Sequence, residues 1–190
     1  MLQTDDITPL IRELSGKLLR FFRKSGVAQQ ECYDQVQNCF ETLLKKRAQG
    51  CEIEDQRRYL WGIARKKVLH YFRKIRPTEE FRSSRVQPIL RTSPSLRLDR
   101  GLRVDLVLQK LSPRERTTFC LRCEGLSLEE IAQVVEKNRS TVNRDLAAIR
   151  EKIDEISGEL DAEFRDVDST PESGAGMITV DDISDSYLRD

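Results

Sequence analysis

The chain has 190 residues, of which 38% are apolar and 34% are charged, and its formal net charge is +1. This composition is typical of a helix-rich protein that forms one ordinary domain or two small ones. No apolar run is long enough to cross a bilayer and no signal peptide opens the chain, so we expect a cytoplasmic protein without membrane insertion.

The two signs of charge are separated along the chain. Residues 1–76 contain 16 Lys and Arg against 9 Asp and Glu, whereas residues 154–190 contain 2 against 12. A basic body joined to an acidic tail indicates that the body binds a polyanion.

Residues 1–76 are predicted to form a first domain of three helices. The first helix starts at Thr8-Pro9 and stops at Ser25-Gly26, the second covers about 28–48, and the third covers about 54–76, before Pro77. Apolar residues at helical spacing predict the buried side of each helix. They are Leu10, Ile11, Leu14, Leu18, Phe21 and Phe22 in the first, Val36, Phe40, Leu43 and Leu44 in the second, and Trp61, Ala64, Val68, Tyr71 and Ile75 in the third.

The third helix mixes cations with aromatic residues. Its cations are Arg57, Arg58, Arg65, Lys66, Lys67, Arg73, Lys74 and Arg76, and Tyr59, Trp61, Tyr71 and Phe72 lie among them. Cations neutralise phosphates and aromatic rings stack on unpaired bases, so the mixture predicts binding of single-stranded nucleic acid. The alternative is a solvated helix whose aromatic residues belong to the core, and for Trp61 and Tyr71 the core is the favoured interpretation because both lie on the apolar stripe.

Residues 77–101 lose the helical periodicity and are rich in Pro, Ser and Arg. They are predicted to be a flexible linker, either a solvated tether or a segment that lies along nucleic acid. The acidic residues 154–190 are predicted to be a largely disordered tail. Three roles remain open for this tail: a solubilising segment, a competitor of DNA for the basic helices, or a docking segment for a partner.

Residues 102–153 are predicted to form a second domain of four helices, at 102–111, at 113–124, and in a helix-turn-helix after Ser127. Apolar residues at helical spacing mark the last two helices: Leu128, Ile131, Ala132 and Val135, then Val142, Leu146, Ile149 and Ile153. Ser127 and Glu130 form a capping-box pattern, and Asn138 is placed to cap the second helix. An αα-hairpin in an ordinary helical core is the alternative.

The exposed side of that second helix carries residues that pair with bases: Arg139, Ser140, Thr141, Asn143 and Arg144. Arginine pairs with guanine and asparagine with adenine, and the first turns of a recognition helix reach the base edges. We therefore predict that this helix reads DNA in the major groove.

Catalytic chemistry has little support in the sequence. His70 is the only histidine and has no evident partner, and no glycine-rich phosphate loop precedes a helix. Five cysteines are an odd number, which favours reduced thiols, and Cys120 and Cys123 are expected to be structural, with Cys120-x-x-Cys123 too isolated for a zinc site. We expect no enzyme activity, no catalytic residues, no cofactor and no metal.

Two stretches together resemble a known family. Leu111-Ser112-Pro113, Glu124-Gly125-Leu126-Ser127 and Glu130-Ile131-Ala132 match the pattern of the second domain of small, two-domain extracytoplasmic-function sigma factors of bacterial RNA polymerase, which are sigma-70-like. YDQVQNCFETLL resembles the clamp-binding helix of their first domain, and YLWGIARKKVLHYFRK resembles the helix that melts the −10 element. The resemblance covers residues 5–153 and implies an all-α fold of two small helical domains joined by a flexible linker.

The resemblance also implies partners and site residues. Residues 1–76 would be region 2-like and would bind the β′ clamp of core RNA polymerase through Asp34, Gln37 and Glu41. The melted −10 strand would lie near the loop 47–56, on Arg57, Arg58, Trp61, Arg65, Lys66 and Lys67. Residues 102–153 would be region 4-like, reading the −35 element of promoter DNA and contacting the β flap. An inhibitory anti-sigma partner is also expected.

The chain departs from the family pattern at two places. Tyr33, Gln35 and Asn38 replace residues of the usual clamp-binding cluster. In the turn of the helix-turn-helix, Glu136 stands where glycine is usual, and we expect Asn138 to take the left-handed conformation instead. The alternative function is a stand-alone helix-turn-helix regulator with an N-terminal partner-binding module; a nucleic-acid enzyme would need a catalytic constellation that the sequence lacks.

Overall fold

The computed structural model describes residues 7–74 and 100–167, and within these ranges it contains seven helices and no strand. A first unit consists of α1 (Thr8–Lys24), α2 (Gln29–Ala48) and α3 (Gln56–Lys74). A second unit consists of α6 (Arg100–Lys110), α7 (Pro113–Cys123), α8 (Leu128–Val135) and α9 (Arg139–Val167). The all-α prediction is confirmed, and the linker predicted at 77–101 lies outside the described residues except for its end, where α6 begins.

The first unit is held by an apolar centre to which all three helices contribute. Phe21 and Trp61 meet edge to face with ring centroids 5.5 Å apart, and both are buried. The remaining buried residues are Leu14, Leu18 and Phe22 of α1, Cys32, Val36, Cys39, Phe40 and Leu43 of α2, and Leu60, Ala64 and Val68 of α3. This set matches most of the predicted apolar stripes.

Two residues of those stripes were wrongly predicted to be buried. Ile11 is 36% exposed and Leu44 is 45% exposed. Successive residues of a helix are about 100° apart. Since Leu10 and Leu43 already face the neighbouring helices, the next residue of each helix turns toward solvent. Tyr71 is half-buried and its hydroxyl oxygen accepts a hydrogen bond from the Ala28 amide at 3.2 Å, while Ile75 lies outside the described residues.

In the second unit, α9 is longer than the sequence indicated. The predicted tail begins at residue 154, but the helix continues to Val167. Ile156 and Leu160 continue the buried stripe of Leu146, Ile149 and Ile153, and α9 packs against α6 with an ion pair of 3.2 Å between Lys110 and Glu159. Burial of this stripe stabilises the helix despite its acidic composition. The predicted tail is therefore wrong for residues 154–167, and residues 168–190 are outside the described part.

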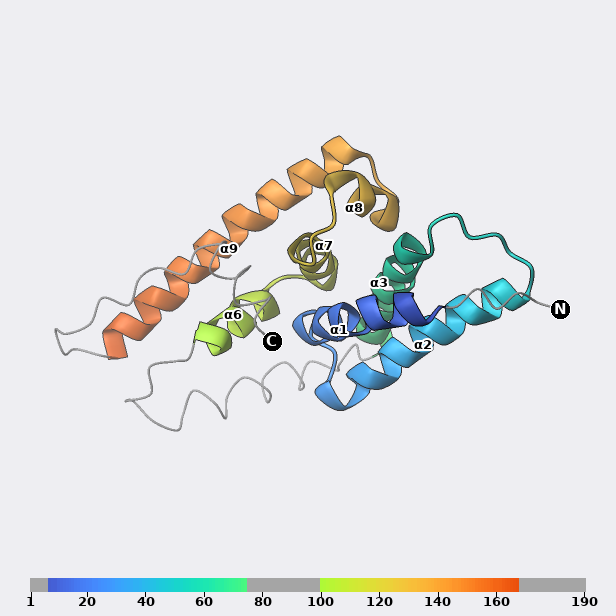
Figure 1. Ribbon diagram of the computed structural model, residues 1–190. Coiled ribbons are helices and arrows are strands. Elements are labelled where there is room, and N and C mark those ends of the chain that lie inside the picture. Colours follow the sequence, from blue (N-terminus) through green and yellow to red (C-terminus); the bar gives the residue numbers. More distant parts are fainter. Residues whose placement is uncertain (1–6, 75–99, 168–190) are drawn as a thin grey trace.

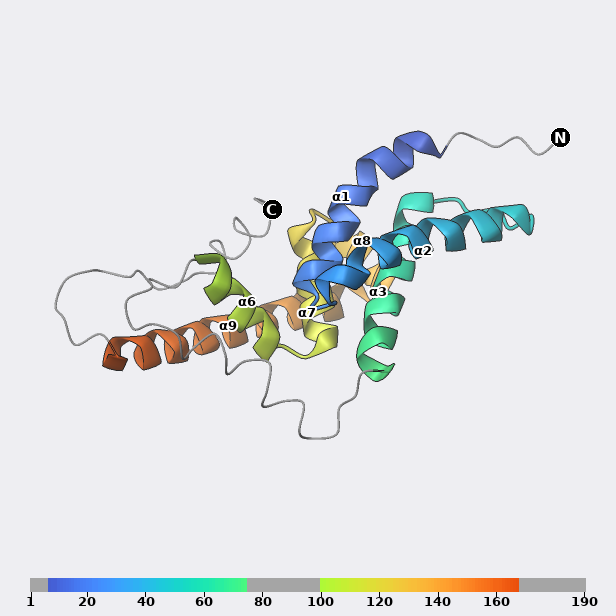
Figure 2. The same cartoon turned by 90° about the horizontal axis from the view of Figure 1, so that it is seen from below.

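The two units pack directly against each other (Figures 1 and 2). Helix α3 contacts α7 and α8, and α1 contacts α7, so that one continuous apolar cluster spans both units. Arg116 of α7 is only 6% exposed at this junction. Its guanidinium donates hydrogen bonds to the backbone oxygens of Ser25, Gln109 and Leu111, at 3.3, 2.9 and 3.2 Å.

Gly26 makes this junction possible. It has a φ of +88°, and a Cβ atom at this position would lie 2.3 Å from a terminal nitrogen of Arg116. Only glycine combines a positive φ with such a close approach.

Among the described helices, none is both long enough and apolar enough to cross a membrane.

Candidate nucleic-acid interface

The helix-turn-helix is built by local capping interactions. The Ser127 hydroxyl accepts a hydrogen bond from the Glu130 amide at 3.2 Å, and the Glu130 carboxylate accepts one from the Ser127 amide at 2.7 Å. These backbone and side-chain bonds hold the pKa of Glu130 below its usual value. The predicted capping box is therefore confirmed, and Asn138 directly precedes the first residue of α9, where a cap belongs.

The turn itself differs from the expectation. Glu136, not Asn138, takes the left-handed conformation, with φ of 58° and ψ of 46°. The reason is the way α8 ends: the Glu136 and Lys137 amides bond back to the Gln133 and Ala132 oxygens, which requires a left-handed residue directly after Val135. A side chain in this conformation costs roughly 1–2 kcal/mol relative to glycine.

The predicted base-reading residues lie together on one exposed face. Arg139, Ser140, Asn143 and Arg144 are exposed and Thr141 is half-buried, while Val142 and Leu146 turn inward. Glu129 of α8 holds the Arg139 side chain through an ion pair of 2.9 Å. Lys137, in the turn before α9, forms an ion pair with Asp145 in the second turn of α9. The face therefore presents donors and acceptors from the first two turns of α9.

Two cations of α3 contact the second unit, and a third contacts α1. Lys66 forms an ion pair with Glu136 at 3.1 Å, and Arg58 donates a hydrogen bond to the side-chain oxygen of Gln133 at 2.7 Å. Both partners belong to the end of α8. Arg57 pairs with Glu13 of α1 at 3.2 Å.

Arg65 lies next to this contact and is half-buried. Burial is the main cause that lowers its pKa, the positive charge of Arg114 lowers it further, and the negative charge of Glu136 opposes the shift. Glu136 therefore faces two neighbouring cations of α3. Lys67 is half-buried on the same helix.

Trp61 does not belong to this surface. It is 1% exposed, and its ring packs against Phe21. Its placement among the DNA-contacting residues is therefore wrong for this conformation, whereas the competing core interpretation is confirmed. The reason is that Leu60, Trp61, Ala64 and Val68 form the buried side of α3.

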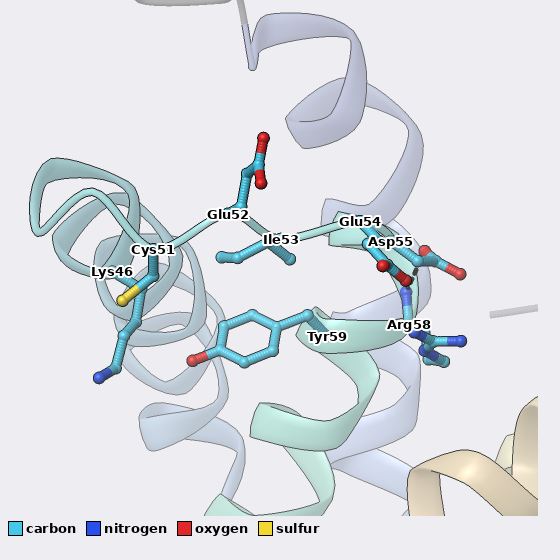
Figure 3. Close-up of a pocket in the computed structure, with 8 residues that line it drawn as sticks. All are labelled: Lys46, Cys51, Glu52, Ile53, Glu54, Asp55, Arg58 and Tyr59. Atoms are coloured by element: carbon cyan, nitrogen blue, oxygen red, sulfur yellow. Dashed lines mark hydrogen bonds between the residues drawn. The ribbon is translucent and has the colours of Figure 1, made fainter.

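A pocket opens between the end of α2 and the start of α3 (Figure 3). It has a volume of about 500 Å³. The Tyr59 ring lies beneath the connecting loop beside Ile53, and Glu52 points away from the ring (Figure 3). The Asp55 carboxylate accepts a hydrogen bond from the Arg58 amide at 2.8 Å and fixes the start of α3. The other lining residues are Lys46, Cys51 and Glu54. The pocket thus combines an aromatic floor with charges of both signs.

The predicted polymerase-binding residues share one side of α2. Asp34 and Gln37 are exposed and Glu41 is half-buried, with a hydrogen bond of 2.9 Å from the Gln37 side chain to Glu41. Tyr33, at 63% exposure, and Leu44 lie near them. This side of α2 therefore offers acidic, amide and apolar groups to a partner.

Sequence reasoning missed the junction residues. Gln133 and Glu136 contact α3, and Arg116 and Glu124 join the units from α7. The only feature of the sequence that pointed to this junction was the replacement of glycine by Glu136.

The cysteines were expected to be structural. This holds for Cys120, which is fully buried, and Cys123 is half-buried. Burial also raises the pKa of Cys39 to about 12, which keeps that thiol protonated.

The helices and the exposed face of α9 define a helix-turn-helix protein whose first unit is helical and basic. Comparison with known proteins identifies what one segment of the chain is similar to. Residues 101–153 match the family model for "Sigma-70, region 4". A search of curated protein sequences gives no match.

Among solved structures, the chain is similar to the sigma factor RpoE from Bartonella quintana, determined in complex with the anti-sigma factor NepR. The TM-score is 0.55 and the identity 22%, over 78% of this chain and 96% of that chain. The likeness shows a shared fold that extends well beyond the region 4 segment. The family match supports the predicted resemblance to sigma factors for residues 101–153, and the structural match shows that the fold is shared over most of the chain.

Proposed function

We propose that this protein is a sigma factor, which binds core RNA polymerase and directs transcription initiation to specific promoters. The observation that carries the proposal is the exposed face of α9, presented by a sigma-70 region 4 segment within a chain that has a sigma-factor fold. The role is that of a DNA- and polymerase-binding protein and not of an enzyme. Its place of action is the chromosome, in the cytoplasm.

In this proposal, the second unit reads the −35 element as duplex DNA. The start of α9 enters the major groove, where Arg139, Asn143 and Arg144 face base edges and Ser140 and Thr141 face the backbone or the bases. The capping box of α8 and the turn at Glu136 fix the angle at which α9 is presented. The part of the second unit that does not contact DNA is proposed to bind the polymerase β flap.

The first unit holds the −10 element as a melted strand. Arg57, Arg58, Arg65, Lys66 and Lys67 supply positive charge for its phosphates. The pocket beneath the loop before α3 is large enough for a flipped base, and Tyr59 offers a ring on which a base can stack. Unstacking costs a few kcal/mol per base, and stacking and pocket contacts offset this cost.

We assign the contact with the polymerase clamp to the exposed side of α2, which carries Asp34, Gln37 and Glu41. An anti-sigma protein is the expected regulator, because the structurally similar RpoE was determined with such a partner.

Co-elution with core polymerase tests the proposal. The full chain is mixed with core enzyme, passed over a size-exclusion column, and the complex is then assayed for binding to genomic promoter fragments. A sigma factor forms a stoichiometric complex and selects a subset of fragments only as part of it. If the chain does not bind the core enzyme but selects DNA fragments alone, it is a stand-alone helix-turn-helix regulator and the proposal is wrong.

A further inference from the structure

We propose that the free protein rests in a closed state in which the end of α8 occupies the surface of α3 that binds single-stranded DNA, with the Glu136 carboxylate in the place of a phosphate. The inference rests on the proposed function for the identity of the DNA strand. The contact between the units is itself a feature of the structure. Helix α3 packs against α8 at the junction seen in Figures 1 and 2.

The contacts at this interface match those that a nucleic-acid strand would make. Lys66 is paired with the Glu136 carboxylate at 3.1 Å, and Arg58 donates to the oxygen of Gln133 at 2.7 Å. Arg65 is half-buried beside them and faces the charge of Glu136. An anionic oxygen and an amide oxygen of α8 therefore use the cations that a phosphate chain requires. The closed state and a strand on α3 exclude each other.

The backbone at Glu136 gives independent support. Among the described residues it is the only one other than glycine with a positive φ. Strained residues of this kind persist where the surroundings hold them and often belong to switching elements. Glycine would form the same turn without strain, but it would leave Lys66 without this carboxylate.

The ion pair between Lys66 and Glu136 is weak enough for DNA to displace it from the surface of α3. The side chains of Lys66 and Glu136 are 69% and 71% exposed, so their ion pair is screened by water and salt. A strand with several phosphates can displace it. The buried bonds of Arg116 and the bidentate contact between Arg20 and Glu124 stabilise the resting arrangement around it.

Zero-length crosslinking tests the closed state without DNA. Carbodiimide couples a carboxylate to an amine only when the two are in contact, and mass spectrometry identifies the joined peptides. The full chain is expected to give a crosslink between Lys66 and Glu136 that disappears in Glu136→Gln. Lys110 and Glu159, 3.2 Å apart within the second unit, provide the internal control. A crosslink at the control pair without one between Lys66 and Glu136 would overturn the closed state.

Competition is tested by adding a fluorescent single-stranded oligonucleotide to the full chain. Glu136→Gln and Glu136→Gly are expected to bind it roughly two- to five-fold more tightly than wild type, the range set by loss of one exposed ion pair. Glu159→Gln changes the net charge equally and is expected to have no such effect. The oligonucleotide should also suppress the crosslink between Lys66 and Glu136 in the wild-type protein.

The outcomes separate the two proposals. If wild type binds the oligonucleotide but Glu136→Gln binds no better than Glu159→Gln, the competition is wrong and the proposed function stands. If neither wild type nor any variant binds single-stranded DNA, both the competition and the −10 role of α3 are wrong.

Discussion

Arg20 of α1 donates two hydrogen bonds to the carboxylate of Glu124, at the end of α7, although 104 residues separate them in the chain. The distances are 3.3 Å from Nε to Oε1 and 3.1 Å from Nη2 to Oε2. The Glu124 side chain is 1% exposed and that of Arg20 is 23% exposed. A bidentate pair with one buried partner is geometrically specific, and it joins the two units.

Removal of this pair is expected to destabilise the protein. Arg20→Ala takes two donors from a buried carboxylate, which costs on the order of 1–3 kcal/mol in the free energy of unfolding. Urea denaturation of the full chain measures the change. Arg12→Ala, at an exposed position of the same helix, is the control. Equal stability of the two variants would mean that the Arg20–Glu124 pair does not stabilise the junction.

The capping box of α8 gives a prediction with a pH dependence. Ser127→Ala should lower stability by about 0.5–2 kcal/mol, because the cap of the helix-turn-helix is lost. The pKa of Glu130 is lowered in the folded state, so its stabilisation is complete above the ordinary Glu value, about 4.3, and is lost as the pH falls through the folded value.

Glu130→Gln tests this sign directly. Wild type should be more stable than Glu130→Gln at neutral pH, and the difference should vanish in acid. Thermal unfolding from pH 7 down to pH 3 measures it. A difference that grows as the pH falls would contradict the assignment.

Base reading by α9 predicts a sequence-dependent loss. Arg144→Ala should cost about 1–3 kcal/mol on the preferred −35 site and relax the preference at one base pair. Competition binding of the holoenzyme to sites varied one base pair at a time measures it. The same loss on every sequence would make Arg144 a phosphate contact.

Polymerase binding through α2 predicts a charge-reversal effect. Asp34→Lys combined with Glu41→Lys should weaken association with core enzyme at least several-fold and leave the helical circular dichroism signal unchanged, because both side chains lie outside the core. Glu151→Lys, an exposed position of α9, controls for added positive charge. Undiminished co-elution of the double variant would place the clamp contact elsewhere.

The helix-turn-helix could be predicted from the sequence because its determinants are local. Ser127 and Glu130 are three residues apart, and the apolar residues of α8 and the first part of α9 have helical spacing. The buried side of α1 could be predicted for the same reason. Such short-range patterns fix the element before any tertiary contact is known.

The errors arose where distant segments or competing signals decide the outcome. The stripe that contains Ile156 and Leu160 was outweighed by the acidic composition of the segment, although burial against α6 stabilises it as helix. The left-handed Glu136 ran against the backbone preference for glycine or asparagine. The junction at Arg116 joins residues more than ninety positions apart, as its bond to Ser25 shows, and no local pattern encodes it.

Reconstituted transcription tests the central claim most directly. Core RNA polymerase from the source organism is incubated with fragmented genomic DNA, with and without this protein, and the 5′ ends of the transcripts are sequenced. A sigma factor produces new start sites that share two upstream elements, and Arg144→Ala reduces them. Start sites that are unchanged by the protein would contradict the account.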